Sequence, residues 1–176
     1  MLTRSGAFTL IELLVVVSVI AILAALALPN FLEAQARSKV GRVAADQRTV
    51  LLGIEMYRVD NNAYPPHTDT PADMARFTTP VAYLGDIPRD PFASRANPIF
   101  RLYGPYYGYE GLADIFFNLN PTWGGGNWLA RQVAGGRQYL VISLGPDGED
   151  QIASEAVHYD PTNGTVSRGD IFILGP

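Results

Sequence analysis

Hydrophobic side chains are concentrated near the N-terminus of the chain. Residues 8–28 contain only three polar residues, which are Thr9, Glu12 and Ser18. An α-helix rises about 1.5 Å per residue, so a helix over this stretch spans roughly the 30 Å hydrocarbon core of a bilayer. The pattern therefore predicts a single transmembrane helix.

A second helical pattern follows Pro29, because apolar residues recur there at spacings of three and four. Proline lacks an amide donor, so we expect a bend or local unwinding at Pro29. The helix should resume at Phe31, continue to about Arg58 and end within residues 60–62. Its apolar face, which should pack against a sheet, consists of Val40, Val43, Ala44, Val50, Leu51, Ile54 and Tyr57.

The C-terminal third shows the short patterns of an antiparallel sheet. Residues 139–143 form an apolar run that predicts a buried strand, and a last strand is expected over residues 171–174. Between them, the Asn163-Gly164 pair favours a hairpin turn. These elements predict an α+β fold, in which a long N-terminal helix packs with its second half on a small C-terminal antiparallel sheet.

Two regions between the helix and this sheet are less regular. Prolines interrupt residues 64–71 and 83–92, which should lie over the surface and not in a central strand. Residues 99–128 are rich in aromatic residues and glycine and predict short strands joined by turns, with Gly124, Gly125 and Gly126 as a flexible turn.

Composition excludes several classes of function. The 176 residues include no cysteine, which excludes disulfides, thiolate metal sites and cysteine nucleophiles. The net charge of −4 includes no basic stripe, so no nucleic-acid partner is expected. His67 and His158 lack the spacing of a catalytic triad or a zinc site, and no enzymatic activity is predicted.

Glu12 is the unusual residue of the apolar segment, because a carboxylate in hydrocarbon is costly unless it is paired. It disfavours a cleaved secretory signal ending at Ala25-Leu26-Ala27. A plain membrane anchor with a stray acid is a further alternative. If the chain is cut just before the apolar run, an α-ammonium group appears one turn away. The same group on a neighbouring copy could pair with Glu12 and set the axial stagger between subunits.

The N-terminal residues resemble the class III signal of type IV pilins and type II secretion pseudopilins. The shared features are the short polar leader that ends Ser5-Gly6-Ala7, the aromatic Phe8, and Glu12 four residues later. The resemblance implies that a prepilin peptidase cuts between Ala7 and Phe8 and that the new Phe8 amine is methylated. The family has glycine where this chain has Ala7.

A second set of residues resembles the major pseudopilins of the type II secretion system. It comprises Tyr57-Arg58-Val59-Asp60-Asn61, Tyr64-Pro65, Tyr83-Leu84 and residues 87–92. The resemblance implies a pilin-like fold, with a leader at 1–7, a transmembrane and assembly helix at 8–30 and a periplasmic globular domain at 31–176. The chain would be a single-pass inner-membrane protein that polymerises into a periplasmic or surface filament.

The same resemblance implies the partners and leaves alternatives. Copies of the chain, the prepilin peptidase and N-methyltransferase, membrane lipid, an inner-membrane assembly platform and minor pseudopilins would be its partners. The predicted function is a structural subunit of a type II secretion pseudopilus that supports protein export. A type IV pilus or DNA-uptake pilin is the close alternative, and a membrane-tethered calcium- or glycan-binding module is a more distant one.

Acidic residues are clustered near the C-terminus, and calcium prefers such hard oxygen ligands. Residues 143–148 and 169–171 resemble the two edges of the calcium loop of major pseudopilins. Carried over by position, Asp147 and Asp170 match best, and Glu149 and Asp150 lie nearby. Calcium is thus a possible cofactor, and the alternative is a set of solvated turns whose aspartates cap their own backbone.

Overall fold

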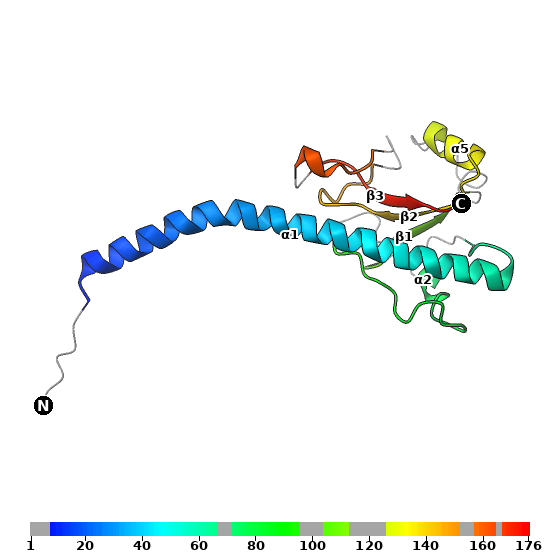
Figure 1. The fold of residues 1–176 in the computed structure, drawn as a ribbon, viewed down its shortest axis with the longest axis horizontal. Coiled ribbons are helices and arrows are strands. Elements are labelled where there is room, and N and C mark those ends of the chain that lie inside the picture. Colours follow the sequence, from blue (N-terminus) through cyan, green and yellow to red (C-terminus); the bar gives the residue numbers. More distant parts are fainter. Residues whose placement is uncertain (1–7, 67–71, 96–103, 113–125, 152–156, 165–166) are drawn as a thin grey trace, which may run out of the picture. The chain divides into compact units, whose positions relative to one another are not determined.

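The computed structural model describes residues 8–66, 72–95, 104–112, 126–151, 157–164 and 167–176. The chain divides into two compact units, Met1–Ala36 and Arg37–Pro176. One helix, α1 (Leu10–Asn61, 52 residues), runs through both (Figure 1). Among the described residues, α1 is the one helix long and apolar enough to cross a membrane.

Helix α1 is continuous through Pro29. A continuous helix is compatible with the expected bend but not with the expected local unwinding. Proline removes a single helical hydrogen bond, and those of the neighbouring residues keep the chain helical. Asn62, at φ 53°, follows the helix in the left-handed region, which asparagine tolerates better than most residues. The predicted end of the helix within residues 60–62 is confirmed.

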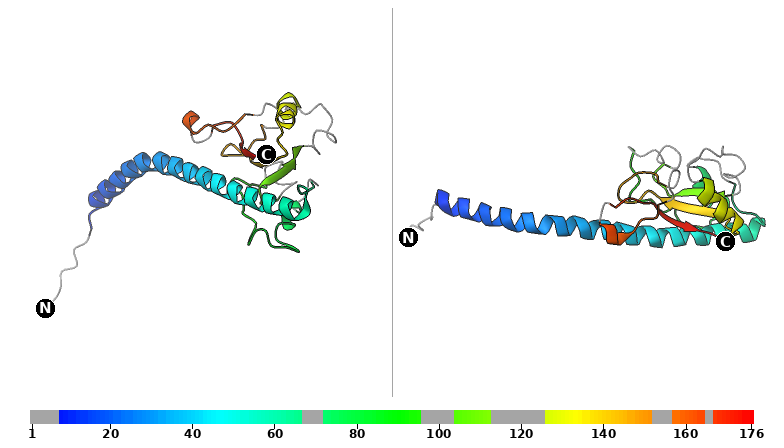
Figure 2. Two further views of the ribbon diagram at one scale, coloured as in Figure 1. Left: turned by 45° about the vertical axis from the view of Figure 1, so that its right-hand side comes forward. Right: turned by 90° about the horizontal axis from the view of Figure 1, so that it is seen from above.

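In the Arg37–Pro176 unit, the described strands form one antiparallel sheet in the order β1-β2-β3 (Figure 2). The strands are β1 (Gly108–Gly111), β2 (Tyr139–Ser143) and β3 (Ile171–Leu174). Tyr109 pairs with Val141, and Val141 pairs with Ile173, so the central strand β2 is hydrogen-bonded on both edges. The helices α2 (Ala72–Ala75) and α5 (Gly126–Ala134) complete the unit together with a 3₁₀ turn, η1 (Pro161–Asn163).

Both faces of the sheet are covered, which explains why β2 is an uninterrupted apolar run. Toward α1, Tyr139 and Val141 pack in a cluster with Val43, Val50 and Ile54 of the helix, all of them fully buried. On the opposite face, Leu112, the residue after β1, forms a second cluster with side chains of β2, β3 and α5, namely Leu140, Ile142, Phe172, Leu174, Trp128 and Val133. The predicted α+β arrangement is confirmed.

A buried polar side chain fixes the helix on the sheet. Gln47 is 3% exposed, and its Nε2 atom donates to the carbonyl oxygens of Ile171 at 2.6 Å and Val141 at 3.3 Å. These carbonyls belong to adjacent strands, so one amide group joins α1 to both β2 and β3. Apolar packing is not directional, whereas these hydrogen bonds specify the position of the helix along the sheet.

The proline-rich segment after α2 lies outside the sheet, as predicted, apart from an isolated bridge between Arg89 and Tyr106. It packs closely on α1 at Gly53, where an added Cβ atom would come within 2.8 Å of the Leu84 side chain. The absence of a side chain at Gly53 therefore makes room for Leu84. Farther along, the Phe92 ring receives the ammonium group of Lys39 at 5.8 Å from its centroid.

Two local predictions were wrong. Gly126 and Trp128 belong to helix α5 and not to a turn and a strand, and Trp128 and Val133 of this helix both pack on the apolar cluster of the sheet. The Asn163-Gly164 hairpin is replaced by the 3₁₀ turn η1, which Asp160 caps by accepting from the Thr162 amide at 2.8 Å. Residues 96–103 and 113–125, where further short strands were predicted, lie outside the described residues.

Candidate functional sites at the helix start and the acidic loop

The first turn of α1 is closed by a reciprocal pair of side chains. The backbone amide and the hydroxyl group of Thr9 donate to Glu12 Oε2 at 2.9 and 2.7 Å, and the Glu12 amide donates to Thr9 Oγ1 at 3.3 Å. This is a capping box, which satisfies amide groups that a helix otherwise leaves without partners. The Thr-x-x-Glu spacing is visible in the sequence, and our sequence analysis missed it.

The cap changes how Glu12 is understood. Both Thr9 donors bond to the same oxygen, Oε2, so Oε1 can accept a further donor such as an ammonium group. Capping and pairing with a neighbouring copy are therefore compatible. Phe8 lies just before the cap and is 82% exposed, whereas Ala7 lies outside the described residues.

The remainder of the Met1–Ala36 unit presents an apolar surface. The large hydrophobic side chains from Leu10 to Leu32 are between 49% and 78% exposed. Ser18, the polar residue at the middle of the segment, donates its hydroxyl proton to the Leu14 carbonyl oxygen at 2.7 Å, so it adds no unsatisfied polar group. A surface of this kind is stable in lipid or against other apolar helices, and not in water.

At the other candidate site, the structure brings Asp147 and Asp170 to either side of Gln151. The backbone amide of Gln151 donates to Asp170 Oδ2 at 3.0 Å, and the side-chain Nε2 atom of Gln151 donates to Asp147 Oδ2 at 2.7 Å. Its Oε1 atom accepts from the Gly169 amide at 3.2 Å. Gln151 is 1% exposed and Asp170 is fully buried. The side chain of Gln151 thus joins the turn after β2 to the chain just before β3.

The other two predicted ligands lie in the same turn. The Glu149 amide donates to Asp147 Oδ1 at 3.3 Å, while the Glu149 side chain is exposed and Asp150 is half-buried. Among the described residues, no group of three or more acidic or histidine side chains is placed to hold a metal ion. Gln151 was missed as a member of this site, since a single glutamine after an acidic run carries no sequence signal.

His158 lies close to the acidic loop but has a different environment. Its Nδ1 atom is 2.9 Å from the Tyr159 carbonyl oxygen, and its ring packs edge-on against Phe172 at 4.8 Å between centroids. These contacts give the His158 ring a structural role, because it packs on a side chain of β3. His67 lies outside the described residues.

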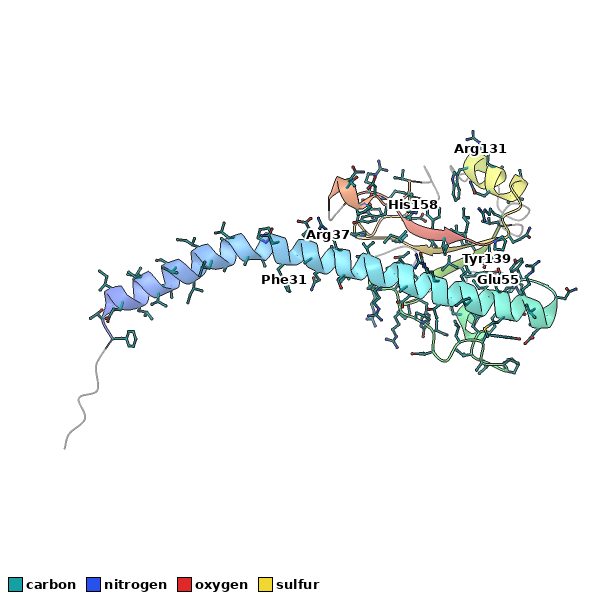
Figure 3. All side chains as sticks on the ribbon, viewed as in Figure 1. Phe31, Arg37, Glu55, Arg131, Tyr139 and His158 are labelled. Atoms are coloured by element: carbon teal, nitrogen blue, oxygen red, sulfur yellow. The ribbon has the colours of Figure 1, made fainter. Side chains whose placement is uncertain are left out.

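Glu55 of α1 contacts Tyr139 of β2 where the helix meets the sheet (Figure 3). Glu55 Oε1 accepts from the Tyr139 hydroxyl at 2.8 Å and from the Tyr64 hydroxyl at 3.4 Å. Burial, and then the hydrogen bond to Glu55, raise the pKa of Tyr139. The Arg58 guanidinium lies over the Tyr64 ring, 4.8 Å from its centroid. The group keeps Tyr139 protonated, and its hydrogen bonds join α1 both to β2 and to the segment that follows the helix.

Two half-buried aspartates lie between α1 and the proline-rich segment. Asp46 Oδ2 accepts from the Tyr107 hydroxyl at 3.0 Å and forms an ion pair with Arg42 Nε at 3.3 Å. Asp90 accepts from the Phe92 amide at 2.8 Å, and burial raises its pKa. The Asp90 amide donates to the Pro105 carbonyl oxygen at 3.0 Å, and this bond, together with the Arg89–Tyr106 bridge, holds the Pro-Arg-Asp-Pro segment against the domain.

Together, a self-capped apolar helix and a second helical half packed on a small antiparallel sheet define a pilin-like protein. The prokaryotic N-terminal methylation motif matches residues 2–28. The chain belongs to the family of the type II secretion system core protein G. It is 30% identical to that protein from Aeromonas hydrophila over 122 residues, which cover 64% of this chain and 81% of the relative.

A second core protein G and a type IV pilus component are also similar to the chain. The core protein G of Klebsiella pneumoniae is 30% identical over 129 residues, which cover 67% of this chain and 86% of the relative. The type IV wide pilus major component PilA4 of Thermus thermophilus is 41% identical over 74 residues, covering 42% of this chain and 56% of PilA4. No solved structure matches the chain.

Proposed function

We propose that this chain is a structural subunit of a type II secretion pseudopilus and that it polymerises through its N-terminal helix. The observation that carries the proposal is the apolar surface of α1, on which large side chains are at least 49% exposed from Leu10 to Leu32. The protein G relatives support the assignment. The subunit works by assembly, and no enzymatic activity is assigned to it.

Processing would prepare the subunit for assembly. A prepilin peptidase cuts between Ala7 and Phe8 and the new amine is methylated, while the C-terminal unit lies in the periplasm. Mass spectrometry of the protein purified from its native membrane tests this step. We expect the first residue to be Phe8 with one added methyl group. A mature chain that begins at Met1 or at Leu28 would contradict the processing route.

Glu12 would then set the register of the filament. In this proposal the amine of one copy's Phe8 pairs with the Glu12 carboxylate of its neighbour, which the cap leaves with a further acceptor oxygen. Electron microscopy should show filaments for the unaltered chain and few or none for Glu12→Ala. Because Glu12→Gln keeps an acceptor for the cap but removes the charge, its failure to assemble would separate pairing from capping.

Secretion and surface pili are distinguishable by phenotype. Deleting the gene should leave secreted enzymes inside the cell envelope and leave surface pili unchanged. Loss of surface filaments with normal secretion would instead favour the pilus function printed for the Thermus thermophilus relative.

We also propose a calcium site at the acidic loop, supported by the short connection of Asp147 and Asp170 through Gln151. These two aspartates would hold the ion, and carbonyl or water oxygens would supply the remaining ligands. Calcium would strengthen the link between the turn after β2 and the start of β3. Thermal unfolding should shift upward with CaCl₂ but not with MgCl₂, and Asp147→Asn should abolish the shift. An equal midpoint with calcium and with a chelator would contradict the proposal.

A further inference from the structure

The second half of α1 carries an exposed apolar stripe that the chain's own fold does not use. Leu52, Met56 and Val59 are 62%, 55% and 81% exposed, at spacings of four and three residues. Such spacings place the three side chains on one face of the helix. Among the described residues of the Arg37–Pro176 unit, the other large aliphatic side chain that is exposed to a similar degree is Val81, at 49%.

The stripe lies away from the face that packs on the sheet. Val50 and Ile54, on the packed face, are fully buried, so the two faces of the same helical segment differ completely in exposure. A soluble helix that contacts only its own domain normally carries polar residues on its outer face. Three apolar residues at consecutive turns on that face therefore indicate a partner.

From this arrangement we infer that the stripe of Leu52, Met56 and Val59 is a second assembly surface, which packs against the uncharged helical segment 13–31 of another copy. The inference rests on the proposed function. The partner segment is supplied by the chain itself, because its large side chains are exposed and it contains no charged residue. The axial stagger proposed for Glu12 would place the first half of one helix beside the second half of another.

Lipid fits the stripe less well than a helix does. Leu52 lies 24 residues beyond Leu28, which corresponds to about 36 Å of helix and exceeds the roughly 30 Å thickness of the hydrocarbon core. In addition, Arg48 and Asp60 are exposed in the turns that border the stripe, and lipid would have to desolvate them. A neighbouring helix can cover the narrow stripe while these charges stay in water.

The helix toward the N-terminal side of the stripe allows close approach. Gly41 and Ala45 are exposed on the same face, and an added Cβ atom at Gly41 would meet no atom within 4 Å. Arg48 lies between Ala45 and Leu52 on this face, and its long side chain can extend past a neighbouring helix into water. Three large side chains bury too little area to hold two copies together by themselves. The stripe therefore acts only as one contact repeated along a filament, in addition to the N-terminal apolar surface.

Substitution of an exposed residue separates assembly from folding. In the full-length chain, we expect Met56→Glu to keep the thermal midpoint of the unaltered protein and its membrane insertion, and to reduce filament mass at least fivefold. Val81→Glu is the matched control, since it places the same acid at an exposed aliphatic residue outside α1. Equal filament mass for the two variants would overturn the inference.

Cross-linking identifies the partner directly, because the chain contains no cysteine that could interfere. One copy would carry Met56→Cys, and the other would carry Leu14→Cys, Val19→Cys or Leu26→Cys, so that three heights of the helix are sampled. In mixed filaments treated with a short bismaleimide, we expect a covalent heterodimer for at least one pair. Val81→Cys should give none with the same partners. Filaments that yield no heterodimer at any height would overturn the inference.

These outcomes are distinct from failure of the proposed function. If the unaltered chain forms no filament, the proposed function fails. If it forms filaments that Met56→Glu leaves intact, only the second surface is excluded. An environment-sensitive dye attached at Met56→Cys tests for contact with lipid in vesicles, before assembly. A signal typical of hydrocarbon would assign the stripe to lipid and would also overturn the inference.

Discussion

The two halves of helix α1 are both rich in aliphatic residues, but these side chains are buried in the second half and exposed in the first. In the second half, Val43, Val50 and Ile54 are fully buried against the sheet. In the first half, residues such as Leu14, Val16 and Ile20 are about half exposed or more, at 55%, 49% and 58%. The same kind of side chain therefore stabilises the monomer in the second half, whereas in the first half it is available for contact with lipid or with another chain.

The largest expected effect is a difference between matched substitutions in the two halves. Ile54→Ala should lower the free energy of unfolding by about 3 kcal/mol, because it opens a cavity in the packed core. Ile20→Ala should change it by less than about 0.5 kcal/mol, because the side chain is not packed within the chain. Chemical denaturation of the full chain in detergent, followed by circular dichroism, measures both values. Equal losses of stability for the two variants would show that Ile20 is packed within the chain as Ile54 is.

Removing the hydrogen bonds of Gln47, in the second half of α1, should lower the free energy of unfolding by somewhat less. Gln47→Leu keeps the apolar volume near the sheet but deprives the carbonyl oxygens of Val141 and Ile171 of their shared donor. The expected loss is about 2 kcal/mol. Thr49→Val is the matched control on the exposed side of the helix and should have little effect in the same denaturation experiment. A Gln47→Leu chain as stable as the unaltered one would show that packing alone positions α1.

These two substitutions also indicate how far the sequence determines the fold. The spacing of Val43, Val50 and Ile54 predicted the packed face correctly, because helical periodicity is a local property. Gln47 interrupts that face, and its role depends on two strands more than ninety residues away. The helix α5 was missed for a similar reason. Trp128 and Val133 pack on the sheet, and this contact is not visible in the local sequence around them.

The candidate sites were predictable to different degrees. Phe8 and Glu12 are part of a contiguous motif, so their position at the start of the helix followed from the sequence. Asp147 and Asp170 are separated by 22 residues, and only the fold shows that Gln151 contacts both. The stripe of Leu52, Met56 and Val59 has helical spacing too, but periodicity could not separate it from the buried face of the same helix.

A smaller effect is expected where the helix meets the sheet through tyrosine. Tyr139→Phe removes the hydroxyl group that donates to Glu55 and keeps the ring. The expected loss of stability is about 1 kcal/mol, because Tyr64 and Arg58 still contact Glu55. Tyr83→Phe, near the end of α1, serves as the control and should cost less. Thermal unfolding of both variants provides the measurement, and equal costs would contradict a special role for the Glu55 contact.

The smallest expected effect depends on pH. Burial raises the pKa of Asp90, so the folded chain holds this proton more tightly than the unfolded chain does. The contribution of Asp90 to stability is therefore complete below about pH 4 and is lost as the pH rises through the raised pKa. Asp90→Asn should unfold at a higher temperature than the unaltered chain at pH 7 and at a similar temperature at pH 3.5. Asp86→Asn, at an exposed site, should show no such difference, and a gain at both pH values would contradict the explanation.

The cap at the start of α1 has a consequence for maturation. The three hydrogen bonds of the cap join Thr9 to Glu12, and Phe8, the described residue before them, takes part in none of the three. Proteolysis ahead of Phe8 would therefore alter the electrical charge at the tip of the helix without shortening or fraying it. The N-terminal end of α1 would therefore already be set in the precursor, before any processing takes place.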